Sequence, residues 1–76
     1  MVTSLVLVEG EHVIEEDLIL PLANTEAFQV GRVDGFGFVV HFVTFSAQDH
    51  DAALRALSTD VPNVTGVLTH ATRESA

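Results

Sequence analysis

Four histidines are the residues best suited to acid–base chemistry or to metal binding: His12, His41, His50 and His70. Three imidazoles can hold a divalent metal ion when the fold brings them together. No H-x-x-x-H spacing occurs, and each histidine belongs to a different segment of the chain. We therefore expect no metal site, and we predict surface or interface positions for these side chains.

The tripeptide Asp49-His50-Asp51 places an imidazole between two carboxylates, an arrangement that can activate a nucleophile. However, no nucleophile stands at a recognisable G-x-S-x-G elbow, and the chain has no cysteine. The start of a helix explains both aspartates, because its positive end favours carboxylates. We therefore predict that the protein is not an enzyme and that it needs no cofactor.

A stretch of five carboxylates is the other candidate site: Glu9, Glu11, Glu15, Glu16 and Asp17. A Ca²⁺ loop needs oxygen ligands at alternating positions and a glycine at its sharp turn, and this pattern is absent. We interpret the stretch as a solvent-exposed acidic face.

The charge of the chain limits its partners. The net charge is −8, with three arginines and no lysine. Nucleic acids and anionic membranes bind through several basic side chains, so both are disfavoured. The acidic, lysine-free composition predicts either a halophile protein or a GC-rich genome. No run reaches the ~20 apolar residues of a membrane span, and the first residues lack the cationic region of a secretory signal. We expect a cytoplasmic protein or a part of a larger particle.

The length indicates one domain, residues 1–71, followed by a polar tail, residues 72–76. A core of this size supplies only ~3–5 kcal/mol of net stability. With 47% hydrophobic residues, the chain carries more apolar surface than one small core needs. Self-association is therefore the expected source of additional stability.

Apolar, β-branched runs predict four strands, at residues 2–8, 27–33, 36–45 and 64–71. Asp34-Gly35 separates the second run from the third and predicts a hairpin with a type I′ turn, in which both central residues have positive φ. Gly37 lies inside a strand and predicts a bulge or a close backbone approach.

Two helices are predicted between these strands. Ser46 begins a near-match to a capping box, and the helix that follows runs through residues 49–58. The other helix covers residues 11–19, because Pro21 removes a backbone donor and is expected to end or kink it. A strand at residues 17–22 is the alternative.

The order strand, helix, strand, strand, helix, strand predicts an α+β ferredoxin-like βαββαβ sandwich, with one antiparallel sheet and both helices on one face. The strand at residues 36–45 is then central, with one face covered and one face bare. A bare apolar face of several hundred Å² is rare on monomers and usually marks an interface, so we expect the sheet to mediate oligomerisation. The candidate interface residues are Phe36, Phe38, Val39, Val43 and Phe45, with either Leu5 and Leu7 or Val6 and Val8 on the neighbouring strand.

Residues 31–34, GRVD, and residues 60–72, DVPNVTGVLTHAT, resemble the C-terminal half of the Lrp/AsnC-type ligand-binding domain. In that family a G-x-x-D element precedes a strand, and a turn of the form l-P-g-V leads to the last strand. The resemblance implies a stand-alone ferredoxin-like domain that dimerises through its sheet and binds amino acids or similar effectors between subunits. It places Gly31 and Asp34 near the effector. His41, within the central strand, is a third ligand-binding candidate or an interface residue.

Residues 4–8, SLVLV, and residues 63–68, NVTGVL, are similar to the small chaperone of periplasmic nitrate reductase. That resemblance implies a ferredoxin-like protein that binds a twin-arginine signal peptide along its sheet. An acidic surface suits such a ligand.

The sequence as a whole predicts a non-catalytic, oligomerising module that binds a small effector or a peptide. A structural subunit of a larger assembly, such as a viral or halophile particle, is one alternative. A signal-peptide-binding assembly chaperone is the other. The expected partner is a second copy of the chain or another protein.

Overall fold

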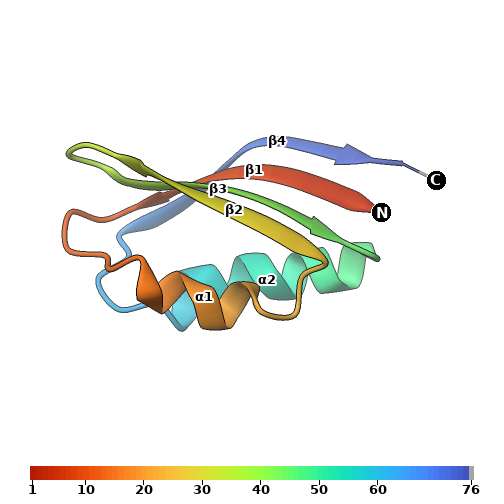
Figure 1. Ribbon diagram of the computed structural model, residues 1–76, viewed down its shortest axis with the longest axis horizontal. Helices are drawn as coiled ribbons and strands as arrows, with labels where there is room; N and C mark the ends of the chain where they lie inside the picture. Colours follow the sequence, from red (N-terminus) through yellow and green to blue (C-terminus); the bar gives the residue numbers. More distant parts are fainter. Residues whose placement is uncertain (76) are drawn as a thin grey trace.

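The computed structural model describes residues 1–75 and contains four strands and two helices (Figure 1). The strands form one antiparallel sheet in the order β2-β3-β1-β4. The predicted α+β class is confirmed, and β1 and β3 are the central strands. In chain order the elements are β1 (Val2–Glu9), α1 (Glu16–Leu22), β2 (Ala27–Val33), β3 (Gly37–Thr44), α2 (Ala47–Thr59) and β4 (Gly66–Glu74).

Both helices cover the same face of the sheet, and the other face is open (Figure 1). Successive side chains of a strand point to opposite faces, so β1 and β3 each divide between a covered and an open side. Val6 and Val8 of β1 and Val40 and Phe42 of β3 are fully buried under the helices, together with Leu57 of α2. Each such burial contributes about 1.5–3 kcal/mol relative to an exposed side chain.

The first helix differs from its prediction. α1 begins at Glu16 rather than at residue 11 and continues through Pro21, so both the predicted end and the alternative strand are wrong. Pro21 lies in the last turn and removes one intrahelical bond, a cost that the burial of the neighbouring leucines offsets. Leu18 and Leu22, one turn apart, are fully buried and hold this short helix on the sheet.

The second helix forms as predicted, with slightly wider bounds. The backbone N–H of Asp49 donates to Ser46 Oγ at 3.1 Å, so the predicted N-cap is confirmed. Ala53 and Leu57 are buried against the sheet. Within residues 1–75, neither helix is long and apolar enough to cross a membrane.

The strands β2 and β3 form the predicted hairpin, but the turn is not of type I′. Val33 pairs with Gly37, which leaves a loop of residues 34–36. Gly35 has a φ of 78°, whereas Asp34 does not have positive φ. A three-residue loop needs only one residue in the left-handed region, and glycine supplies it without steric cost.

The backbone of Gly37 lies close to the backbone at the end of β1. Its φ is 142°, and a Cβ at this position would overlap the carbonyl oxygen of Val8. The close approach predicted for Gly37 is therefore confirmed. Beside it, the Gly10 N–H donates to the Phe36 carbonyl oxygen at 2.6 Å and ties the hairpin loop to the end of β1.

The last strand continues beyond its predicted end at residue 71. Thr72 pairs with Ser4, and Arg73 pairs with Thr3, so residues 72–74 of the expected polar tail belong to the sheet. The first residues of β1, which lie between β3 and β4, provide the hydrogen-bonding partners that extend β4 to Glu74. The last residue of the predicted tail, at position 76, lies outside the described residues.

Candidate functional site

The open face of the sheet presents apolar side chains from three strands. Leu7 of β1 lies opposite both Val39 of β3 and Leu68 of β4, and side chains paired in register share a face. Leu5 and Val43 extend this surface along the two central strands. We call these five residues the open-face patch. Of the two alternatives predicted for β1, the structure therefore places Leu5 and Leu7 on the open face.

The centre of the open face contains polar residues but no carboxylates. His41 lies between Gln29 and the patch, and Arg73 lies opposite Thr3. The pairing of the strands places Glu9, an acidic residue, on this face as well, but at the end of β1 and away from the centre. Depletion of charged residues is typical of the centre of protein–protein interfaces.

The dimensions of the open face match those of a small interface. Its strands have 8, 7, 8 and 9 residues. At ~3.3 Å per residue and ~4.8 Å between strands, the face measures roughly 26 by 19 Å. Two such faces in contact bury roughly 1,000 Å² when each is treated as a plane, and protruding side chains add to this area. This value reaches the lower range of specific interfaces.

The predicted interface residues fall in three different places. Val39 and Val43 belong to the open-face patch. Phe36 lies in the hairpin loop and Phe45 follows the end of β3, and both are exposed. Phe38 is 2% exposed and packs beneath the helices, so it has no surface to offer a partner. The reason is the pleat of β3, which sends its even-numbered side chains, the larger ones, toward the core.

The three predicted ligand-binding residues do not line a common cavity. Gly31 and His41 lie on neighbouring strands of the open face, and Asp34 lies in the hairpin loop beyond the end of the sheet. A Cβ at Gly31 would have nothing within 4 Å, so this part of the face is open to solvent. A ligand-binding role for the three stays a prediction.

The four histidines are also dispersed. His12 precedes α1, His41 is on the open face, His50 is in the first turns of α2, and His70 occupies the irregularity in the pairing of β4 with β1. In the part of the chain that the structure describes, no group of three or more His, Asp or Glu side chains is arranged to hold a metal ion.

A buried polar network links α2 to the sheet, and sequence reasoning missed it. The surface or interface position predicted for His50 is therefore wrong, because its side chain is buried between α2 and the sheet. His50 Nε2 lies 2.5 Å from Ser4 Oγ, and His50 Nδ1 lies 3.3 Å from Asp51 Oδ1. Ser4 Oγ also lies 3.1 Å from Thr72 Oγ1. All bonds are satisfied when Nδ1–H donates to Asp51, the Ser4 hydroxyl donates to Nε2, and the Thr72 hydroxyl donates to Ser4. The hydrogen bonds among Ser4, His50 and Asp51 follow the same sequence as those of a Ser-His-Asp catalytic triad.

The network has no room for a substrate. Ser4 is 1% exposed, His50 is 7% exposed, and the imidazole stacks on the Phe42 ring with centroids 5.6 Å apart. A nucleophile needs space beside it for the reacting carbonyl and for oxyanion donors. The geometry therefore favours a role in holding α2 on the sheet. The pattern Asp49-His50-Asp51 was the available signal, but the serine is 46 residues from the histidine and no spacing rule connects them.

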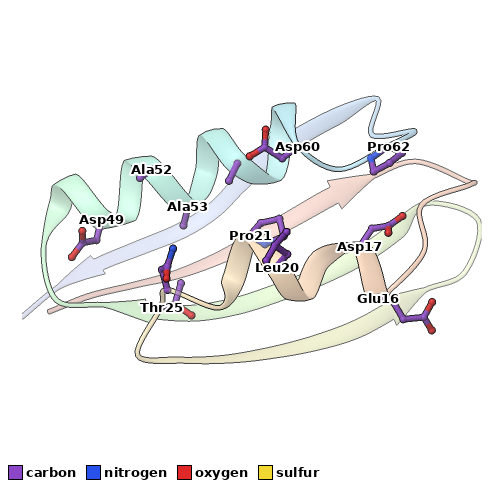
Figure 2. A pocket seen from close by; sticks show the side chains of 12 residues that line it. Glu16, Asp17, Leu20, Pro21, Thr25, Asp49, Ala52, Ala53, Asp60 and Pro62 are labelled. Atoms are coloured by element: carbon purple, nitrogen blue, oxygen red, sulfur yellow. The ribbon is translucent and has the colours of Figure 1, made fainter.

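A groove of about 820 Å³ lies between the two helices (Figure 2). Figure 2 shows Leu20 and Pro21 of α1 on one side, and Ala52 and Ala53 of α2 on the other. We call this cavity the helix groove. Its rim carries four carboxylates, those of Glu16, Asp17, Asp49 and Asp60.

Comparisons with family models, with curated proteins and with solved structures found no match. The functional proposals therefore rest on the geometry of residues 1–75.

Proposed function

We propose that this chain is a non-catalytic, self-associating module of ferredoxin-like fold, whose open-face patch contacts a second copy of the chain. The observation that carries the proposal is an apolar sheet face, free of carboxylates at its centre, on a chain of net charge −8. The ferredoxin-like assignment is supported by the sheet order β2-β3-β1-β4 and by two helices on one side of the sheet.

Electrostatics favours this face for contact between copies. Two copies of the chain repel each other through their net charge, so they are expected to associate where negative charge is lowest. An open sheet face with apolar side chains on its two central strands also suits a two-fold interface, in which the same patch is used on both subunits.

The position of the ligand-binding candidates agrees with the same assembly. In a dimer built on the open face, Gly31 and His41 would lie at or near the subunit interface. The Lrp/AsnC resemblance expects an effector between subunits. A non-catalytic role is supported by the burial of Ser4 and His50, which closes their triad-like network to substrates.

The molecular mass in solution tests the proposal. We expect sedimentation equilibrium at 10–100 μM protein and 0.15 M salt to give twice the chain mass of 8.2 kDa. A mass of one chain at 100 μM would refute self-association through the open face. A mass of many chains would favour the alternative of a structural subunit.

A further inference from the structure

We propose that the helix groove binds a cationic amphipathic helix of a partner protein. The apolar side chains of that helix would cover Leu20, and its basic side chains would reach the carboxylates of the rim. This proposal extends the binding role and does not depend on self-association, because the groove lies in the helix layer and not on the open face (Figure 1).

Leu20, on the α1 side of the groove, provides an apolar contact surface. Leu20 is 81% exposed, although it is a large aliphatic residue, whereas Leu18 and Leu22 of the same helix are buried. Across the groove, Ala52 and Ala56 are spaced i, i+4 and so lie on the same face of α2. Small side chains at these positions allow the axis of a third helix to approach within about 8–10 Å.

The rim provides charge without internal compensation. Asp49 and Asp60 lie toward opposite ends of the groove, as Figure 2 shows. Among residues 1–75 the basic side chain within 4 Å of a carboxylate is that of His50, beside Asp51, so no arginine neutralises the rim. Asp60 caps the C-terminal end of α2, where the helix dipole disfavours a negative charge. Unneutralised charges of one sign in a concave surface concentrate the field and attract cationic ligands.

The length of the groove indicates a helical occupant. Asp49 and Asp60 are separated by about 16 Å along the axis of α2, at ~1.5 Å per residue. A bound helix of about three turns spans the same distance, so basic residues near its two ends meet the two aspartates while apolar residues between them meet Leu20. An apolar helix without basic residues would bury carboxylates that have no partner, which is costly.

Fluorescence anisotropy with a designed probe tests the proposal. The probe is a labelled peptide of about fourteen residues, with leucines at helical spacing and arginines on the remaining face, and its counterpart carries glutamates in place of the arginines. We expect saturable binding of the arginine peptide, weaker binding at higher salt, and no binding of the glutamate peptide.

Two pairs of variants locate the binding site. Asp60→Asn should weaken binding roughly two- to fivefold, whereas Asp34→Asn, which makes the same change in net charge outside the groove, should leave it unchanged. Leu20→Ser should weaken binding roughly tenfold, whereas Leu68→Thr on the open face should not weaken it.

Several results would overturn the proposal. These are absence of saturable binding below 1 mM, equal loss in Asp60→Asn and Asp34→Asn, or loss in Leu68→Thr rather than in Leu20→Ser. The mass of the unliganded chain is measured separately, so failure of this proposal and failure of self-association can be told apart.

Discussion

Replacing Leu68 by threonine perturbs the open-face patch with little expected effect on the fold. The side chain is 57% exposed, so it contributes little to the core of a single copy, and threonine is well suited to a strand. Complete burial of a leucine contributes ~1.5–3 kcal/mol, so covering the exposed part of Leu68 contributes ~0.9–1.7 kcal/mol in each copy. Threonine keeps one methyl group, which leaves a loss of about 1 kcal/mol per copy. A symmetric dimer then loses about 2 kcal/mol, or roughly 30-fold in its dissociation constant.

Sedimentation equilibrium over a range of protein concentrations measures this constant. Leu20→Ser is the matched control, because it removes a leucine of even greater exposure from the other layer of the molecule. Thermal melts followed by circular dichroism verify that both variants remain folded. A dissociation constant that changes less than threefold in Leu68→Thr, or that rises equally in Leu20→Ser, would show that the open face is not the interface.

Three further predictions concern stability at a fixed protein concentration. Gly37→Ala should lower the free energy of unfolding in urea by at least about 2 kcal/mol, because its Cβ overlaps a neighbouring carbonyl and its φ is positive, whereas Gly31→Ala, with open space, should change it by less than about 1 kcal/mol. Equal effects would contradict the close approach. Ser4→Ala should cost about 1–3 kcal/mol by leaving the buried His50 Nε2 without a donor, and adding His50→Leu should cost less than the sum of the two single changes. Strictly additive costs would contradict the network. Ser46→Ala should lower the stability by about 1 kcal/mol in thermal melts, and Ser46→Asp should retain it. Equal melting temperatures for the alanine and aspartate variants would refute the cap.

Local signals in the sequence predicted most of the elements. Runs of β-branched residues indicated four strands, Asp34-Gly35 indicated the hairpin, and Ser46 indicated the start of α2. These signals are short-range, so no tertiary contact was needed to interpret them. Less local features were predicted poorly: Val13 packs into the core ahead of α1, and this contact lies in the stretch where a helical start was expected.

The orientation of the central strands was not predictable from their own residues. Both sides of β1 and of β3 are apolar, and the covered sides contain the polar residues Ser4 and Thr44, against the usual rule of burial. His50 explains Ser4, because its imidazole provides the buried hydrogen bond from another element. Whether Leu5 and Leu7 or Val6 and Val8 face the open side of the sheet could therefore be decided only from the packing of α2.

The helix groove was hidden from the sequence for a related reason. Leu20 and the aspartates of α2 lie far apart along the chain, and each alone is ordinary: an exposed leucine, or acidic residues near helix ends. Only the packing of α1 beside α2 brings them to one cavity.

The sheet and the helices form two layers (Figure 1), and this arrangement determines how many grooves a dimer presents to a target and on which sides. Two copies joined back to back through their sheets would carry their grooves on opposite outer sides. A target with one basic segment would occupy either site independently and gain nothing from the pairing. A target with two such segments, on a tether long enough to pass around the pair, would be held by avidity, at effective concentrations that reach the millimolar range for short flexible tethers.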